Sequence, residues 1–424
     1  MVDNFIPPNS YAIDFGTSNT AIARWNTVTQ RGELVKLPDI SQQFGSQSCL
    51  IPSLVYVENA AVGQVIVGQA VRDRGLDLTN DPRFFRNFKR GIGTEIQGFL
   101  PELDGVKIAF EQIGEWFLRK LITSIQAEAE IESLILTVPV DSFESYRHWL
   151  MGVCQSLAIS QVRILDEPTA AALGYGAAND KPLLVVDFGG GTIDLSLVQL
   201  SVDSSPKGYL LKWGQKMLGN TAQQKNIARV IAKAGDNLGG ADIDNWLVDY
   251  FARTQGLPKS ALTTRLAERL KIKLSSATEA KEVYFNDETL ETYSLSLSRD
   301  RLEKILEEQG FLQRLDELID LLLQQARRAD LAITQIDSVL LVGGSVQIPA
   351  VQNWIKQYFD EEKVKRQLQL EAIAARVAYG IESGNSSGSF AVIQRSSGIG
   401  VRFQSASHQA IAVKIDFGSG SCIF

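Results

Sequence analysis

Short apolar runs alternate along the chain with longer stretches of helical periodicity. Leu134–Val138 and Val339–Val342 are β-rich runs of the kind that is buried in a covered sheet. Apolar residues at helical spacing, with charged residues between them, predict helices in five further stretches. These helices are expected at 110–128, 145–158, 241–254, 262–276 and 301–330. The alternation of strands with helices indicates an α/β architecture.

One polar pattern occurs twice, each time after an apolar strand. Ile13–Thr20 reads IDFGTSNT, and Val186–Asp194 reads VDFGGGTID. Alternating leucines follow the second copy, so strand, glycine turn and strand predict a β-hairpin. The repeat is too long for a solenoid, and we therefore expect two similar α/β lobes that each open with this hairpin.

Length and charge narrow the class of protein. At 424 residues and 46.6 kDa the chain is expected to form two or more domains. Its net charge of −7 and pI of about 5.2 argue against nucleic acid or an anionic membrane as the main partner. The amino terminus lacks a signal pattern, and no apolar segment approaches the roughly 18 residues that span a bilayer. We therefore expect a soluble, cytoplasmic protein.

The cysteines and histidines exclude several kinds of site. Cys49, Cys154 and Cys422 are far apart and odd in number, which predicts neither a disulfide framework nor a CxxC metal site. This usage indicates a reducing compartment. His148 and His408 are the only histidines, so a His-rich metal site or a His-based triad is not expected.

The two glycine turns suggest phosphate chemistry. Glycine allows successive backbone N–H groups to converge on an anion, and two turns from two lobes could hold a polyphosphate from both sides. The chain contains no GxxxxGK[ST] and no GxGxxG motif, which disfavours the P-loop and Rossmann routes. Asp14, Asp187 and Asp194 would lie near the phosphates, where Mg²⁺ held through water could neutralise them. The alternative is that each aspartate makes only an Asx hydrogen bond within its turn.

These motifs resemble the nucleotide-binding domain of the seventy-kilodalton heat-shock chaperone family, within the actin and sugar-kinase superfamily. The matching stretches occur in the family's order and cover almost all of residues 11–383. They are Ile13–Thr20, Phe88–Gly93, Thr137–Arg147, Asp166–Gly176, Asp187–Asp194, Asn237–Asp244, Glu268–Ser276 and Leu341–Pro349. The resemblance implies a two-lobed actin-like ATPase fold, in which duplicated ribonuclease H-like lobes surround a nucleotide cleft.

The domain boundaries follow from the same match. Residues 1–181 and 369–383 are expected to form lobe I, and residues 182–368 lobe II, with a helical subdomain at roughly 230–310. The Gly- and Ser-rich composition from Gly384 predicts a flexible linker. The rest of 384–424 is a tail too short for a stable domain. Ser397–Val401 faintly resembles the first strand of the family's substrate-binding domain, so the tail could be a stump of it.

The resemblance also assigns site residues. It implies nucleotide contacts by Gly16, Thr17, Ser18, Gly189, Gly190, Gly191, Thr192, Gly239, Gly240, Glu268, Lys271, Ser275, Gly343, Gly344 and Ser345. It implies catalytic roles for Lys89, Glu167, Thr17, Asp187 and Asp194, and water-mediated metal binding by Asp14 and Asp187.

Several of these residues have a simpler alternative. Lys89 could belong to a solvated basic loop, although the resemblance brings it to the γ-phosphate. Glu268, Lys271 and Ser275 share a helix face that would bind ribose and adenine, but the first two could form only a surface ion pair. Glu167 precedes Pro168, which predicts a helix entrance facing the cleft. Arg147, matched with Pro139 to the family's coupling pair, could instead be a helix salt-bridge partner.

Three positions depart from the family pattern. Ile272 and Gln347 replace two arginines that sandwich the adenine, and Ala374 replaces an aspartate near the nucleotide. A cation–π contact contributes about 0.5 to 2 kcal/mol. The loss of two contacts predicts adenine binding weaker by about 5-fold to 1,000-fold.

The functional expectation is a magnesium-dependent ATPase whose nucleotide-driven lobe closure is linked to protein folding. The implied cofactors are ATP or ADP and Mg²⁺, with K⁺ as a further candidate. The implied partners are a J-domain co-chaperone and a nucleotide-exchange factor, and unfolded polypeptide only if a substrate-binding domain is supplied. The alternatives are a nucleotide-sensing scaffold without turnover and a small-metabolite kinase of the same superfamily.

Overall fold

The computed structural model describes most of the chain, in segments that all belong to one compact unit. These segments are residues 9–29, 31–44, 48–78, 80–94, 100–139, 144–157, 159, 161–175, 181–203, 225–286 and 289–366. The expected return to lobe I at 369–383 with the departure at Ala374, and the linker and tail at 384–424 with Cys422, lie outside the described residues.

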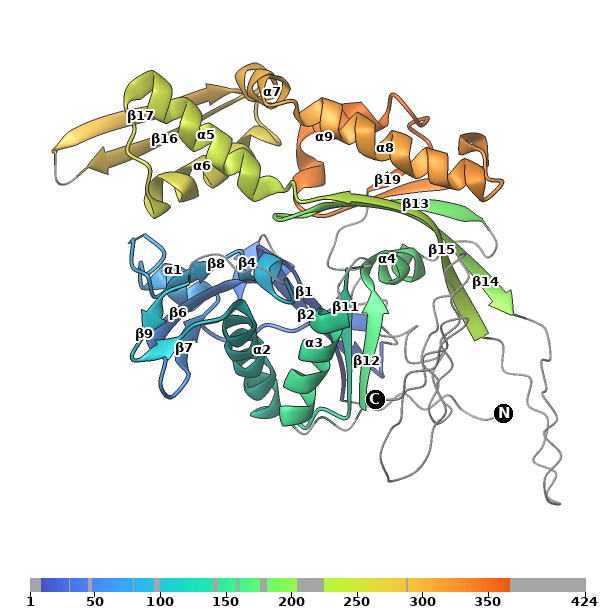
Figure 1. The fold of residues 1–424 in the computed structure, drawn as a ribbon, viewed down its shortest axis with the longest axis horizontal. Helices are drawn as coiled ribbons and strands as arrows, with labels where there is room; N and C mark the ends of the chain where they lie inside the picture. Colours follow the sequence, from blue (N-terminus) through green and yellow to red (C-terminus); the bar gives the residue numbers. More distant parts are fainter. Residues whose placement is uncertain are drawn as a thin grey trace, which may run out of the picture. The chain divides into compact units, whose positions relative to one another are not determined.

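The first sheet is built around the first predicted hairpin (Figure 1). Its strand order is β12-β11-β1-β2-β5-β4, and β3 pairs with β2. β1 and β2 are antiparallel, with Ile13 opposite Ile22, whereas β1 and β11 run parallel, with Ile13 opposite Leu136. The strands are β1 Ser10–Phe15, β2 Asn19–Asn26, β3 Arg31–Leu34, β4 Gln42–Phe44, β5 Ser48–Pro52, β11 Ser133–Val138 and β12 Gln161–Asp166.

The second sheet repeats this arrangement around the second hairpin. Its order is β15-β14-β13-β18-β19, with β13 antiparallel to β14 and parallel to β18, as β1 is to β2 and β11. Its strands are β13 Pro182–Phe188, β14 Ile193–Asp203, β15 Lys225–Asp236, β18 Ser338–Val342 and β19 Val364–Arg366. The equivalent topology confirms the predicted duplication and the two-lobed actin-like α/β fold.

Two helices cover one face of the first sheet. α2 (Phe110–Gln126) and α3 (Glu144–Ser156) share a core with β1 and β11. Ile113, Phe117 and Leu121 of α2 are fully buried and recur every fourth residue, which is the spacing of one helix face. The structure confirms both predicted helices to within two residues at each end.

Smaller elements complete the first lobe. β6, β7 and β8 form a three-stranded sheet, and β9 pairs with β10. The 3₁₀ helix η1 places Lys89 and Arg90 at the end of this region. These elements are β6 Leu54–Asn59, β7 Gln64–Val67, α1 Gln69–Asp73, β8 Phe84–Arg86, η1 Phe88–Gly91, β9 Glu102–Leu103 and β10 Val106–Lys107.

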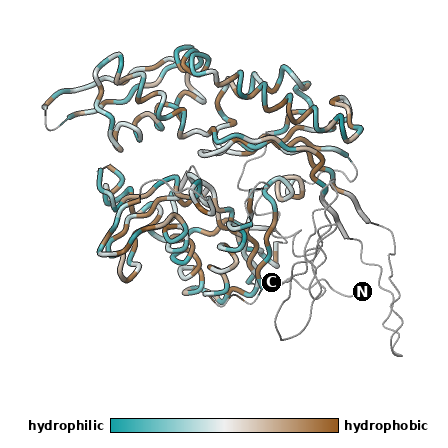
Figure 2. The backbone as a smooth tube through the Cα atoms, viewed as in Figure 1, coloured by the Kyte–Doolittle hydropathy of each residue, from teal (hydrophilic) through white to brown (hydrophobic). Residues whose placement is uncertain are grey.

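Both faces of the second sheet are covered, which explains the unbroken apolar run that precedes its glycine turn. Val186 and Phe188 of β13 lie in the large core of the second lobe. Val185 points to the other face and packs with Ala171 and Ala172 of α4 (Glu167–Tyr175). A strand buried on both sides needs apolar residues at every position. The helices, in contrast to this strand, carry both hydrophobic and hydrophilic residues along their length (Figure 2).

The remaining elements lie in the second lobe. Helices α5 and α6 match the predictions at 241–254 and 262–276, and β16 and β17 form a separate hairpin. These elements are α5 Gly240–Gln255, α6 Ala261–Leu274, β16 Glu279–Asn286, β17 Glu291–Ser298, η2 Ile333–Gln335, η3 Ser345–Gln347 and α9 Pro349–Ile355. Within the described residues, no helix combines the length and apolarity needed to cross a membrane.

The prediction of one long helix at 301–330 is wrong. The structure has two helices there, α7 (Arg299–Glu308) and α8 (Phe311–Arg328). They are separated at Gly310, whose φ of 67° lies in the left-handed region that ends helices and that glycine adopts readily. The apolar stripe that includes Leu315 and Leu322 is buried in the core of the second lobe.

Candidate functional site: two glycine hairpins and a buried charged centre

The turn of the first hairpin is held by a serine from the following strand connection. Ser53 donates from Oγ to the carbonyl of Gly16 at 2.7 Å and from its backbone N–H to the carbonyl of Ser18 at 2.9 Å. The Ser53 hydroxyl also lies 3.0 Å from Oγ1 of Thr20 in a buried contact. These bonds fix the backbone of Gly16, Thr17 and Ser18, the residues expected to bind phosphate.

The second turn is held by two glycine-rich segments that the sequence assigned to the same site. The carbonyl of Gly189 accepts from the backbone N–H of Gly240 at 3.1 Å and from Oγ of Ser345 at 2.9 Å. Gly239 approaches so closely that a methyl group on it would overlap the backbone of Gly190. The structure therefore brings the 239–240 and 343–345 segments together with the second hairpin.

The tips of the two hairpins are in direct contact. A methyl group on Gly191 would lie 2.6 Å from Oγ1 of Thr17, and one on Gly190 would overlap Oγ of Ser18. Real Cβ atoms do not approach other atoms this closely, so a larger residue at either position would displace the facing side chain. Residues 170 or more apart in the sequence thus meet as the repeat suggested.

Arg90 connects the first lobe to the second hairpin. Its guanidinium donates to the carbonyl of Gly191 and, at 2.8 Å, to Oδ2 of Asp242 in the first turn of α5. The Arg90 Nε is buried and has no hydrogen-bond partner among the described residues. The sequence alone did not single out Arg90, because its contacts join residues 101 and 152 positions apart.

A buried charged centre lies beside the hairpins. Lys89 Nζ is 3.2 Å from Oε1 of Glu167, the first residue of α4, and its side chain is 10% exposed. The same ammonium lies 5.6 Å from the ring centroid of Phe15. Asp14 accepts a hydrogen bond of 2.6 Å from Oγ1 of Thr137 at the end of β11. Lys89 is therefore not a solvated loop residue, and Glu167 begins a helix as expected.

Burial and mutual repulsion shift the titration of the carboxylates. Burial raises the pKa of Glu167 to about 7, against the opposing effect of Lys89 and with the help of Asp14 and Asp194. Burial also raises the pKa of Asp187 well above its usual range, and the charges of Glu167, Asp194 and Asp14 raise it further. Asp187 and Asp194 stand opposite each other in the hairpin ladder. Burial raises the pKa of Asp194 too.

This centre has the composition of a site for a cation. Three neighbouring carboxylates and one lysine act electrostatically on Asp187, so the centre carries more negative than positive charge. A bound divalent ion would neutralise this excess negative charge. Among the described residues, no group of three acidic, Cys or His side chains is placed to hold a metal ion directly. The residues fit Mg²⁺ held through water at Asp14 and Asp187, which stays a prediction.

The predicted adenosine-binding face lies on α6, and its side chains have other partners. Glu268 Oε2 lies 3.4 Å from Nη2 of Arg72 in the first lobe. Lys271 Nζ lies 2.8 Å from Oδ1 of Asp244 and donates to the carbonyl of Gly240 at 2.7 Å. The alternative of a Glu268–Lys271 surface ion pair is therefore wrong. Ser275 Oγ donates to the carbonyl of Lys271 at 3.2 Å.

Four further positions from the sequence analysis, two glycines, Ile272 and Arg147, lie in different surroundings. Gly343 has a φ of 103° and packs against the backbone of Phe188, whereas Gly344 has open space around its Cα. Ile272, which stands where the family has an arginine, is 55% exposed. Arg147 lies 2.7 Å from Asp166 at the end of β12, so its partner is not on its own helix.

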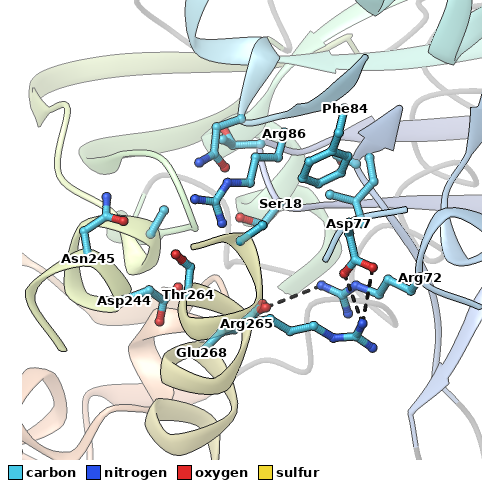
Figure 3. Close-up of a pocket in the computed structure, with 16 residues that line it drawn as sticks. Ser18, Arg72, Asp77, Phe84, Arg86, Asp244, Asn245, Thr264, Arg265 and Glu268 are labelled. Carbon is cyan, nitrogen blue, oxygen red and sulfur yellow. Dashed lines mark hydrogen bonds and ion pairs between the residues drawn. The ribbon is translucent and has the colours of Figure 1, made fainter. Parts of the chain in front are cut away.

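A small cavity separates α5 and α6 from the first lobe (Figure 3). Its volume is about 70 Å³, and its lining includes Ser18, Arg86 and Glu268. Arg265 Nη1 lies 3.1 Å from Oδ2 of the buried Asp77, and this ion pair and the Arg72–Glu268 pair both cross from one lobe to the other. A drug-sized ligand occupies roughly 300 to 1,000 Å³. The cavity in this structure is therefore smaller than a typical pocket for a drug-sized ligand.

Comparison with known proteins agrees with the repeated architecture. The sequence model of the family described as "Hsp70 protein" matches residues 12–204 and 222–398. The "Chaperone protein DnaK" of Elusimicrobium minutum (strain Pei191) is 28% identical over 397 residues, which are 88% of this chain and 58% of that protein. The protein of the same name from Thermotoga petrophila (strain ATCC BAA-488 / DSM 13995 / JCM 10881 / RKU-1) is 28% identical over 389 residues, 86% of this chain and 58% of that protein.

The chain spans 58% of the length of these relatives. The family match covers both hairpins, η1, α4 and the two glycine segments that pack on the second turn. The two hairpins belong to the two equivalent sheets, and η1 and α4 supply Lys89 and Glu167 of the charged centre beside the hairpins. The chain is thus a member of the Hsp70 family and contains that family's nucleotide-binding domain.

Proposed function

We propose that this chain binds ATP between its two hairpins and hydrolyses it with Mg²⁺. The observation that carries the proposal is the direct contact of Thr17 and Ser18 with Gly190 and Gly191, beside the buried centre of Lys89 and the carboxylates. Backbone N–H groups of both turns would bind the phosphates once the tips separate. Mg²⁺, when bound with the nucleotide, would neutralise phosphate oxygens next to these carboxylates.

The residues of the centre would supply positioning and proton transfer. Lys89 is held near the tips by Glu167 and Phe15 and would move its ammonium onto the terminal phosphate. Glu167 has a pKa of about 7, which suits a group that orients water and accepts its proton near neutral pH. Phosphoryl transfer depends mainly on such positioning and charge stabilisation.

The wider chaperone role is part of the same proposal. Nucleotide-driven movement of the lobes would couple ATP turnover to protein folding, with a J-domain co-chaperone and a nucleotide-exchange factor as partners. Unfolded polypeptide would be a further partner only if a substrate-binding domain is supplied. K⁺ stays a candidate second ion.

Phosphate release from ATP by the full chain tests this proposal. We expect Mg²⁺-dependent release that Lys89→Ala abolishes and that Lys120→Ala, at an exposed lysine of α2, leaves unchanged. The melting temperature of each variant shows whether it is folded. Binding of ATP without release would support a nucleotide-sensing scaffold, and release only after addition of a sugar or acid would support a metabolite kinase.

A further inference from the structure

Arg86 brings a cation to the cavity between the lobes without an anion beside it. The residue ends β8, its side chain is exposed, and it lines the cavity that separates α5 and α6 from the first lobe. Figure 3 shows the side chain extending from the first lobe toward Ser18 and the helices of the second lobe. Within the part of the chain that the structure describes, its guanidinium forms no hydrogen bond and no ion pair.

The carboxylates that line the cavity are already paired with other cations. Three of them line it, and each lies within 3.4 Å of a cation other than Arg86: Asp77 of Arg265 at 3.1 Å, Glu268 of Arg72 at 3.4 Å, and Asp244 of Lys271 at 2.8 Å. Four cations thus face three carboxylates among the described residues. The surplus positive charge is that of Arg86, so a ligand rather than the protein has to supply its anion.

The backbone holds Arg86 close to the turn of the first hairpin. Arg86 stands opposite Leu54 in the antiparallel β6–β8 pair, and such paired Cα atoms lie about 4.5 to 5.5 Å apart. Ser53, which precedes Leu54, donates its backbone N–H to the carbonyl of Ser18 at 2.9 Å. Ser18 and Arg86 both line the cavity of about 70 Å³. A phosphate bound at this turn and the Arg86 guanidinium would therefore share one small space.

A phosphate group is the anion that suits this position. The arginine guanidinium is a planar fork of N–H donors that binds two phosphate oxygens at once. The backbone N–H groups of a glycine turn converge on the same kind of group. The alternative is an arginine that stays solvated with no ligand, which is the ordinary state of an exposed arginine.

We propose that Arg86 is a nucleotide-binding residue, whose guanidinium contacts a phosphate group of ATP or ADP held at the first hairpin turn. The inference rests on the proposed binding of ATP between the hairpins, but it does not depend on turnover. Arg86 would act beside Lys89, which lies three residues further along the chain and would reach the terminal phosphate. Affinity should therefore depend on Arg86 only for ligands that carry phosphate.

Calorimetric titration of the full chain with Mg–ADP and with adenosine tests this contact. Arg86→Gln removes the charge and should raise the dissociation constant of ADP by about 10-fold, the lower end for a hydrogen bond to a charged group, because the Arg86 side chain is exposed. The dissociation constant of adenosine, which has no phosphate, should change by less than about 2-fold. Arg86→Lys keeps the charge but loses the fork, so its affinity for ADP should be intermediate.

Arg24→Gln is the matched control. Arg24 is an exposed arginine of β2, in the same lobe, and it does not line the cavity. This variant removes the same charge, so it measures the effect of net charge alone, and its affinity for ADP should change by less than about 2-fold. Both Gln variants should melt within about 2 °C of the unchanged chain, because neither loses an ion pair between described residues.

The results separate this inference from the function on which it rests. If the unchanged chain binds ADP and Arg86→Gln binds it equally well, Arg86 is a solvated arginine and the inference is refuted, while the ATP proposal stands. Equal weakening of ADP and adenosine binding would also refute a phosphate contact. Inorganic phosphate that binds through Arg86, with ADP binding independent of Arg86, would show a site for a free anion and overturn the proposal. If the unchanged chain binds neither ATP nor ADP, the proposed function fails and the inference fails with it.

Discussion

Glu167 should make the unliganded protein less stable as the pH rises from about 4.5 to about 7. Burial raises its pKa from 4.5 in the unfolded chain to about 7 in the folded one. Between these values the folded protein binds more protons than the unfolded chain, so the free energy of unfolding falls with pH. The side chain is 18% exposed, and the shift corresponds to about 3 kcal/mol at about 1.4 kcal/mol per pH unit.

Glu167→Gln removes this titration and keeps an oxygen that can accept from Lys89. Urea unfolding at pH 5.0 and pH 7.5 gives the change in unfolding free energy for each chain, and carboxylates that do not interact with Glu167 cancel in the comparison. The unchanged chain should lose about 2 to 3 kcal/mol more than the variant over this interval. Part of the difference comes from Asp187, whose pKa is raised by the Glu167 charge.

Glu128→Gln, at an exposed position after α2, is the control and should behave like the unchanged chain. Equal pH slopes for Glu167→Gln and the unchanged chain would refute the reasoning. Such a result would mean that Lys89 keeps Glu167 ionised in the folded state. Glu167 would then be a poor proton acceptor at neutral pH, and the mechanism proposed above would lose its base.

Three further changes test particular contacts. Gly239→Ala places a methyl group against the backbone of the second hairpin, and it should lower the free energy of unfolding by about 1 to 3 kcal/mol in a thermal unfolding experiment. Gly344 faces open space, so Gly344→Ala should lower it by less than about 1 kcal/mol. Arg265→Ala should lower the free energy of unfolding by about 2 kcal/mol, because it leaves the buried Asp77 without its cation. A double-mutant cycle with Asp77→Asn should show that most of this loss depends on the pair. Gly310→Ala should cost about 1 kcal/mol, measured by urea unfolding, because its φ of 67° is unfavourable for alanine and no other atom is displaced.

The fold was predictable from the sequence where a local pattern dictates it. The hairpins carry their turn residues and their apolar strands within a few positions, so both were recognised and their repetition indicated two lobes. The break at Gly310 was missed because apolar residues keep helical spacing on both sides of it, and a glycine inside such a pattern is often tolerated. Its left-handed backbone is visible only in the structure.

The charged centre was predictable for a similar reason, and the contacts between lobes were not. Asp14 and Asp187 occupy equivalent places in the repeat, so the sequence itself relates them. Arg72 and Glu268 are 196 positions apart, and neither belongs to a repeated pattern. Tyr146 likewise follows the helical periodicity of α3 as an ordinary buried aromatic residue. Only the fold shows that its hydroxyl is buried without a hydrogen-bond partner among the described residues.

The ion pairs across the cavity suggest how nucleotide and lobe position would be linked. The resemblance assigns Glu268 to the ribose, whereas in this structure Glu268 is paired with Arg72 of the other lobe. If the nucleotide binds there as proposed, ribose and Arg72 would compete for one carboxylate, and nucleotide binding at Glu268 would favour separation of this pair. A ligand shifts a conformational equilibrium only through such a difference in affinity between the two states. Arg72→Ala should therefore tighten nucleotide binding, because it removes the competitor without altering the phosphate-binding turns, and weaker binding by this variant would show that Arg72 itself contacts the nucleotide.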